Sequence, residues 1–157
     1  MQGNAKVEAR LQAELANELA ARHQYEAHSA MYDNWGYKRL AKIAKRLADE
    51  EGGHANELME RLTFFNQVPN VSVLGPVNVK STVPEMIASD FSAETKAIDD
   101  YGSDYALSVV AGDVVTAINY FAEHAKDESE HANLWEAELQ MIKDVGLQNY
   151  LAEQMRE

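Results

Sequence analysis

Apolar residues recur every three or four positions through most of the chain, as at Val7, Leu11, Leu15 and Leu19. This spacing places them on one face of an α-helix, and the positions between them are rich in Ala, Glu, Lys, Arg and Gln, which favour helix. The pattern therefore predicts an all-α fold in which each helix buries one apolar stripe against its neighbours.

Proline and glycine divide this helical pattern. All three prolines fall within residues 69–84, so long helices are allowed before and after that stretch. Gly36 and Gly112, with turn-forming neighbours, interrupt the two halves, and Gly146 ends the second one. We therefore expect four long helices over residues 4–33, 37–65, 83–110 and 113–145, and a short fifth helix over residues 147–157.

The stretch between the second and third helices differs in character. Residues 71–79 combine four valines with Pro and Gly, which is typical of extended chain long enough to run the length of a bundle. Thr82 and Glu85 then predict a capping box, and Asp113 is a second predicted N-cap. Because the other links are short, the sequence predicts two antiparallel helical hairpins joined by a long crossover, which is a four-helix bundle.

Composition and charge narrow the function. A length of 157 residues, with 46% apolar and 25% charged residues, predicts one globular domain over residues 1–157. The formal charge of -12 disfavours nucleic acid and anionic membrane as partners and favours cations. The absence of Cys excludes thiolate chemistry, so a metal must be bound by carboxylate or imidazole. Without a targeting segment or a long apolar run, we expect a cytoplasmic protein.

Two Glu-x-x-His motifs lie on the second and fourth predicted helices, at residues 51–54 and 128–131. Three residues turn a helix by about 300°, so the carboxylate and the imidazole of each motif project from nearly the same face. Glu18 lies 33 residues before the first motif, and Glu94 lies 34 residues before the second. The chain is thus a weak internal duplication in which each half offers the same three ligands.

The two hairpins, packed antiparallel, would bring these four carboxylates and two imidazoles together in the middle of the bundle. Four carboxylates nearly neutralise two divalent cations, and one imidazole per metal favours Fe(II) or Mn(II) over Mg or Ca. Taken alone, Glu18 or Glu94 would be a solvated surface residue, but Glu18 continues the apolar stripe of its helix, where an unpaired carboxylate is costly. We therefore predict a di-metal site with six ligands: Glu18, Glu51, His54, Glu94, Glu128 and His131.

Further side chains share the faces of these ligands. Tyr25 lies seven residues after Glu18, so it is a hydrogen-bond donor to a ligand, an electron donor to the oxidant, or a tyrosine of the core. Tyr101 bears the same relation to Glu94, and there a core role is favoured. His124 is an auxiliary iron ligand or a packed side chain, with packing favoured.

Two other features have less specific interpretations. His23 and His28 lack such partners, so we expect them on surfaces or at subunit contacts. The basic run over residues 38–46 is either a docking surface for an acidic electron donor or, as is more common, a solvated helix face.

With these residues in these positions, the sequence resembles the bacterioferritins, and the resemblance extends over nearly the whole chain. It implies a ferritin-like four-helix bundle with a long crossover and a short C-terminal fifth helix. The matching segments are Asn17-Glu18-Leu19, Gln24-Tyr25, His28, Asn34 to Leu40, Glu51 to His54, Pro69-Asn70, Leu74-Gly75, Ser89-Asp90, Glu94, Asp127-Glu128, His131 and Gly146 to Leu151.

The resemblance also implies a function. It implies a hollow shell of 24 subunits, each of which binds two iron ions, oxidises Fe(II) with O2 or H2O2 as a ferroxidase, and stores ferric mineral. Whether iron leaves the site for the cavity or stays as a redox cofactor is left open, as is the choice of oxidant. The implied roles are terminal ligands for Glu18 and Glu94, bridging ligands for Glu51 and Glu128, and one nitrogen ligand per iron for His54 and His131.

Two other functions are compatible with the same residues. The chain could be a non-catalytic or regulatory shell subunit, with zinc or nothing in the site. It could also be a small-molecule di-iron oxidase outside storage, although the bacterioferritin-like segments far from the site disfavour this.

The sequence departs from the family at two positions. Family members bind haem between two-fold-related subunits through a Met that follows the bridging Glu of the second helix, and here that position is Gly52. We therefore expect the usual haem to be absent. Arg46 likewise replaces a His that can bind iron on the inner surface. In the family, haem helps electrons from a ferredoxin-type donor reach the stored mineral for iron release. Loss of the haem ligand therefore suggests either a homomeric shell with poor haem-assisted release or a mixed shell with a haem-binding paralogue.

Overall fold

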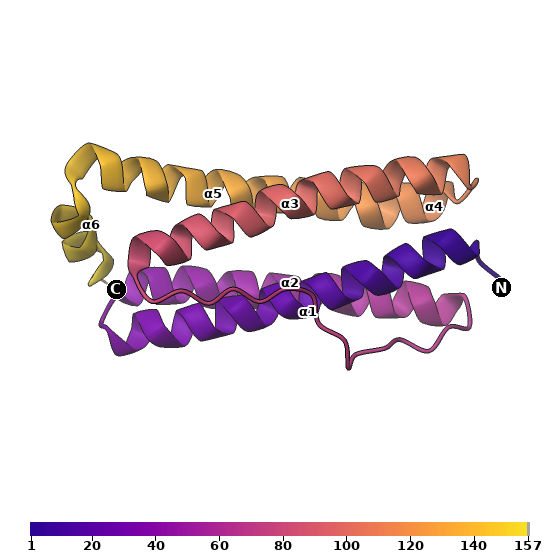
Figure 1. Ribbon diagram of the computed structural model, residues 1–157, viewed down its shortest axis with the longest axis horizontal. Helices are drawn as coiled ribbons and strands as arrows, with labels where there is room; N and C mark the ends of the chain where they lie inside the picture. The colour runs from indigo at the N-terminus through magenta and orange to yellow at the C-terminus, as the bar shows by residue number, and fades with distance from the viewer. Residues whose placement is uncertain (157) are drawn as a thin grey trace.

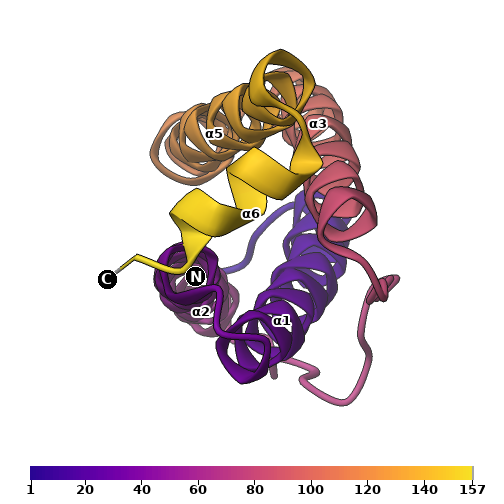
Figure 2. The same ribbon diagram turned by 90° about the vertical axis from the view of Figure 1, so that its left-hand side faces the viewer.

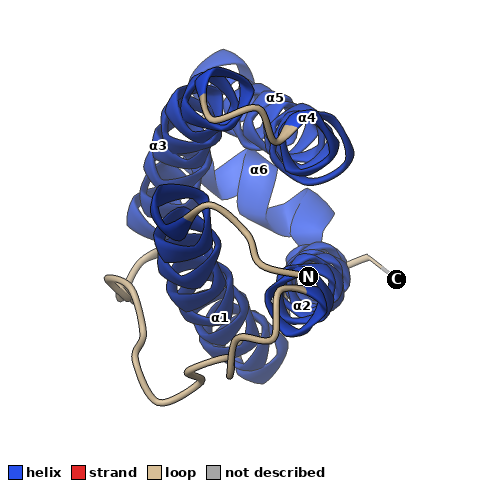
Figure 3. Cartoon of the chain, turned by 90° about the vertical axis from the view of Figure 1, so that its right-hand side faces the viewer, coloured by secondary structure: helices blue, strands red, loops and turns tan. Residues whose placement is uncertain are grey.

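The computed structural model describes residues 1–156 and shows helices joined by loops, with no β-strand in that range (Figure 3). The predicted long helices are confirmed to within one residue at each end, and the fifth helix ends at Gln154. Glu157, the last residue of the expected domain and fifth helix, lies outside the described residues. The elements are α1 (Ala5–Asn34), α2 (Lys38–Phe64), α3 (Val83–Val110), α4 (Val114–Thr116), the π-helix η1 (Ala117–Ala122), α5 (Glu123–Val145) and α6 (Leu147–Gln154).

The helices form the predicted pair of hairpins. Helices α1 and α2 make one antiparallel hairpin, and α3 pairs with the nearly continuous helix α4–η1–α5 to make the other (Figure 1). The crossover, residues 65–82, returns along the bundle, so α2 and α3 run in the same direction. Helix α6 lies across one end of the four long helices (Figure 2). Among residues 1–156, none of the helices combines the length and the apolar character needed to span a membrane.

Backbone amides of the crossover donate hydrogen bonds to α1. The Gly75 amide donates to the Ala16 carbonyl at 2.8 Å, and the Asn78 amide donates to Gln24 Oε1 at 2.8 Å. A Cβ at position 75 would lie 3.1 Å from the Cα of Asn17, so the close approach of the two backbones requires glycine there.

Both predicted N-cap positions are confirmed, but the capping hydrogen bond forms at Asp113 and not at Thr82. Asp113 Oδ1 accepts a hydrogen bond from the Thr116 amide at 3.0 Å, as an N-cap does. The Thr82 hydroxyl instead donates to Glu85 Oε2 at 2.7 Å and makes no capping bond to the backbone. A charged carboxylate is a strong hydrogen-bond partner, so this side-chain pair replaces the predicted capping box.

The fourth long helix is not a regular α-helix. Residues 117–122 form a π-helix, in which the backbone hydrogen bonds skip one residue more than in an α-helix. This widened turn ends directly before α5, which carries His124 and the second Glu-x-x-His motif.

Two apolar clusters fill the two halves of the bundle. One surrounds Trp135 and the other surrounds Leu58, and both side chains are fully buried. On α1 the second cluster ends at Leu15 and the first begins at Tyr25, so Glu18 lies between them. A similar gap separates the two clusters on α2, between Ala48 and Ala55, and on α3, between Ile87 and Tyr101. The predicted ligands therefore occupy one polar layer between two apolar cores.

The structure corrects the expectation for His28. Its side chain is fully buried, with Nδ1 2.9 Å from Asp90 Oδ2 on α3, and the Lys80 amide of the crossover donates to Nε2 at 3.4 Å. His28 thus connects three segments that are far apart in sequence. It lies three residues after Tyr25 and four before Tyr32, both buried, so the helical spacing of α1 is a signal for its burial that the expectation overlooked. His23 is exposed, as expected for a surface residue.

A buried charged cluster joins α1 to α3 away from the polar layer. Arg10 donates from Nη2 to Glu14 Oε1 at 2.7 Å and from Nε to Asp104 Oδ1 at 2.5 Å. Burial, together with a hydrogen bond to Asp104, raises the pKa of Glu14 from 4.5 to about 8. Glu14 therefore keeps a proton at neutral pH in the folded protein.

Between pH 5 and pH 8 we expect the free energy of unfolding to fall less in Glu14→Gln than in the wild type. The folded protein holds a proton on Glu14 that the unfolded chain releases above pH 4.5, so the free energy of unfolding falls as pH rises toward about 8. Glutamine does not ionise, so the variant should lose about 1–3 kcal/mol less than the wild type over this range. Chemical unfolding at both pH values measures the difference. Glu136→Gln, at an exposed position of α5, is the control, and identical pH dependence in all three proteins would contradict the prediction.

Candidate metal centre

The structure brings the six predicted ligands together in the polar layer, and each of them is buried. They form two groups, and within each group one potential ligand atom per residue lies within 4.8 Å of the others. The groups share two carboxylates, which thereby stand between the two positions that a metal ion could take. One group is Glu18, Glu51, His54 and Glu128, and the other is Glu51, Glu94, Glu128 and His131.

Both imidazoles direct Nδ1 toward the shared carboxylates. Nδ1 of His54 lies 3.1 Å from Glu51 Oε2 and 3.1 Å from Glu128 Oε1. Nδ1 of His131 lies 3.3 Å from the other oxygen of each, Glu51 Oε1 and Glu128 Oε2. Nδ1 is therefore the nitrogen that each ring would offer to a metal ion.

The outer nitrogen of each imidazole contacts a half-buried carboxylate. Nε2 of His54 lies 3.2 Å from Asp127 Oδ2, and Nε2 of His131 lies 2.7 Å from Glu50 Oε2. Such contacts fix the tautomer and orientation of a ligating histidine. Sequence reasoning gave neither acid this role. The signal that could have found them is their position, because each directly precedes a shared carboxylate.

Two tyrosines contact Glu94 and Glu18, the two carboxylates that each belong to only one group. The hydroxyl of Tyr25 on α1 donates to Glu94 on α3, and the hydroxyl of Tyr101 on α3 donates to Glu18 on α1. Tyr25 is also a buried member of the apolar cluster around Trp135, whose Nε1 donates to the Tyr25 hydroxyl at 2.8 Å, so these contacts fit both a donor to a ligand and a tyrosine of the core. Tyr101 is a core residue, as favoured, but its hydroxyl also contacts a predicted ligand.

The electrostatics of the layer favour a bound cation. Burial and the neighbouring Glu18 raise the pKa of Glu51 to about 8, and burial also raises the pKa of Glu94 well above its ordinary value. Within residues 1–156, Glu51 Oε1, Glu128 Oε1 and His131 Nδ1 are buried and form no hydrogen bond. Divalent cations would satisfy these atoms and neutralise the carboxylates, so the donor set fits two metal ions.

A cavity of about 300 Å³ gives access to the centre from between α1 and α3. Three of the predicted ligands, Glu18, Glu94 and Glu128, are part of its lining. Pro76 and Asn78 of the crossover line it as well, so the crossover forms part of the cavity wall.

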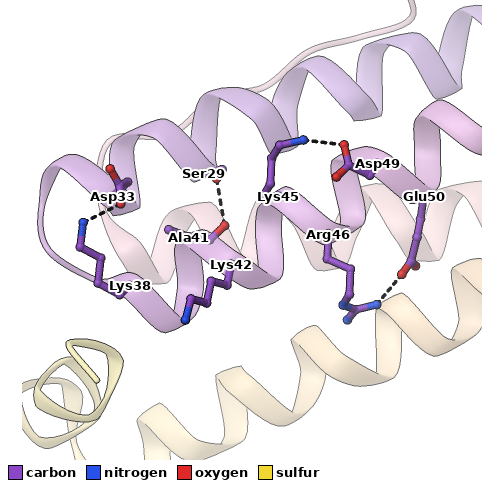
Figure 4. A pocket seen from close by; sticks show the side chains of 9 residues that line it. All are labelled: Ser29, Asp33, Lys38, Ala41, Lys42, Lys45, Arg46, Asp49 and Glu50. Atoms are coloured by element: carbon purple, nitrogen blue, oxygen red, sulfur yellow. Dashed lines mark hydrogen bonds and ion pairs between the residues drawn. The ribbon is translucent and has the colours of Figure 1, made fainter. Parts of the chain in front are cut away.

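The basic run on α2 is largely paired with acids. Lys38 contacts Asp33 at 2.7 Å, and within α2 two further pairs form at 2.5 Å and 2.6 Å, as Figure 4 shows. The shallow cavity beside them is therefore lined by both signs of charge. This pairing favours a solvated helix face over a basic docking surface. The two further pairs are Lys45–Asp49 and Arg46–Glu50.

Comparison with known proteins agrees with this geometry. The family model described as a ferritin-like domain matches residues 8–145. A bacterial ferritin of Synechocystis sp. is 36% identical over 155 residues, which are 99% of each chain, and a bacterial ferritin of Pseudomonas aeruginosa is 34% identical over 99% of this chain and 100% of its own. A bacterioferritin of Brucella melitensis is 33% identical over 96% of this chain and 92% of its own. The chain therefore belongs to the ferritin-like family, and within it to the bacterioferritin type that the sequence resembles.

Proposed function

We propose that the protein stores iron and oxidises it, acting as a ferroxidase at the buried centre. Membership of the ferritin-like family supports iron storage. The observation that carries the oxidase function is the set of two buried metal-binding groups that share two carboxylates. Two ions held side by side can each give one electron, so together they reduce O2 to peroxide, or H2O2 to water.

The protein contributes charge and geometry to this reaction. Two Fe(II) ions, as substrates, would reach the centre through the cavity between α1 and α3 and would be neutralised by its four carboxylates. Glu51 and Glu128 would bridge the two ions, Glu18 and Glu94 would each bind one, and each histidine would supply one nitrogen. Tyr25 would act as a further catalytic residue, because it lies between Glu94 and Trp135 and could supply an electron to the oxidant.

A non-catalytic or regulatory shell subunit is the second candidate function. The buried layer argues against it, because a subunit needed only for assembly gains nothing from burying four carboxylates in its core. X-ray absorption and anomalous scattering at the iron and zinc edges separate the two. Iron in both positions supports the oxidase, whereas zinc without Fe(II) oxidation supports the regulatory subunit.

We expect Glu18→Ala and His54→Ala to remove the rapid phase of Fe(II) oxidation. Each change deletes a donor from the first group, so a pair of ions is no longer held together. Stopped-flow absorbance of ferric species after mixing with two Fe(II) per subunit measures the phase. Glu136→Ala removes an exposed carboxylate of α5 and should behave as the wild type. An unchanged rapid phase in both ligand variants would disprove the assignment.

We further propose a shell of 24 subunits, homomeric or mixed with a haem-binding paralogue. Apolar side chains exposed on single chains, such as Val110, Val115 and Leu147, are available for subunit contacts. Native mass spectrometry of the complex purified from its own cells should give a 24-mer. The number of different polypeptides in it separates the two forms of the proposal, and a stable monomer or dimer would contradict both.

The position that binds haem in the family does not fit that ligand here. Gly52 has no side chain to coordinate iron, and a Cβ there would lie 3.1 Å from Arg22 Nη1. Arg22 in turn donates from Nε to Glu26 Oε1 at 2.9 Å, so a charged pair lies beside this position. We therefore propose that homomeric shells of this chain bind no haem there.

We expect the purified recombinant protein, after incubation with haemin and desalting, to lack a Soret band at stoichiometric intensity. Gly52→Met restores a thioether but leaves the charged pair of Arg22 and Glu26 in place. A visible spectrum of each protein checks this. One haem per two wild-type subunits would contradict the proposal, and haem in the variant alone would show that the missing thioether is the cause.

A further inference from the structure

Tyr101 is connected to all four long helices on one side of the metal centre. It belongs to α3, its hydroxyl donates to Glu18 on α1, and the oxygen lies 3.2 Å from Nδ1 of His124 on α5. Nε2 of His124 lies 2.8 Å from Glu57 Oε2 on α2. The four side chains therefore form one continuous series of polar contacts that crosses the bundle.

We propose that Tyr101 is a positioning residue for the metal ligand Glu18, and that His124 and Glu57 hold its hydroxyl in place. The inference rests on the proposed metal centre and concerns a part of it that the six ligands leave unexplained. It assigns a role to three side chains, Tyr101, His124 and Glu57, that do not themselves bind the metal.

The hydroxyl of Tyr101 has one proton, and it donates that proton in a hydrogen bond to Glu18. A carboxylate is only an acceptor, so the contact with Glu18 requires the tyrosine to donate. One oxygen of Glu18 is thereby occupied, and the other, Oε2, lies 3.7 Å from Nδ1 of His54 inside the first metal-binding group. The tyrosine thus selects which oxygen of Glu18 faces the metal position.

The ring of His124 packs against both Tyr101 and His54. It is 1% exposed, its plane stacks on the ring of His54 with centroids 4.3 Å apart, and it meets the Tyr101 ring edge-on at 5.4 Å. The fully buried ring of Phe121, in the π-helix before α5, packs on Tyr101 at 6.0 Å. Rotation of Tyr101 away from Glu18 would break all of these contacts, so its hydroxyl is kept in position.

The two halves of the centre are therefore supported differently. Tyr25 holds Glu94 in the second group, and its own oxygen accepts from Trp135, whose indole can only donate. Tyr101 holds Glu18 in the first group, and its support ends in Glu57, an exposed carboxylate. Each tyrosine should consequently control one metal position and leave the other nearly unchanged.

We test this with Co(II), which binds such sites without being oxidised by air and reports each position by its visible absorption. Calorimetric and spectroscopic titration of the full-length wild-type protein should show two Co(II) ions per chain. Tyr101→Phe should weaken one of the two by about 10–100-fold, as the loss of a residue that orients a ligand typically does. Tyr25→Phe should weaken the other one.

Tyr32→Phe is the matched control, because Tyr32 is fully buried and its hydroxyl forms no hydrogen bond within residues 1–156. It should bind both ions as the wild type does.

If Tyr101→Phe does not fold, His124→Phe replaces it, because losing the contact of His124 with Tyr101 should weaken the same Co(II) position by a smaller factor. Glu57→Gln should retain more affinity than Glu57→Ala, since the amide can still hydrogen-bond to His124.

Failure of this inference is distinguishable from failure of the proposed function. Two wild-type Co(II) sites that are both unchanged in Tyr101→Phe would overturn the positioning role, as would equal weakening of both sites. A wild-type protein that binds no Co(II) and oxidises no Fe(II) would overturn the metal centre itself, and the positioning role with it.

Discussion

The structure depends on burying a layer of four carboxylates and two imidazoles across the middle of a helical bundle. Charged groups resist transfer out of water, so the layer exists only where packing on both sides is strong enough to hold the helices around it. The two apolar clusters provide that packing, one around Trp135 and one around Leu58. Each long helix consequently changes from apolar to polar and back to apolar along a single face.

The outer parts of the candidate ligands contact other protein groups, and their inner parts face one another across the centre. The imidazoles contact Asp127 and Glu50 through Nε2, and the terminal carboxylates each accept a tyrosine hydroxyl. The partner comes from another helix in every case, so helix packing and ligand orientation are a single property of the fold. This mutual dependence explains why atoms such as Glu51 Oε1 and His131 Nδ1 can stay directed at the centre without a hydrogen bond inside the described chain.

The helices and the clustering of the six candidate ligands could be predicted from the sequence because both follow from spacings along the chain. A stripe of apolar residues, a proline-rich interruption and a Glu-x-x-His spacing are each visible within a few turns. Features that join distant segments could not be predicted. The partners of His28 come from α3 and the crossover, and the series of contacts that begins at Tyr101 includes side chains from three other helices. The missing capping bond of Thr82 has a different, local cause, because its hydroxyl donates to the side chain of Glu85 instead of bonding to the backbone.

Comparison with the buried acids outside the candidate centre shows why a cation would be favoured there. Glu14 and Asp104 share Arg10, Asp90 faces His28, and Glu138 binds Arg39 at 2.6 Å, so each has a basic partner within the protein. In the metal centre four carboxylates face only two histidines, and no Lys or Arg of residues 1–156 lies within ion-pair distance of them. Outside the centre three basic side chains serve four buried acids, one of which keeps a proton, whereas in the centre two histidines serve four carboxylates, which leaves a larger deficit of positive charge. Two divalent ions between the shared carboxylates would make up that deficit.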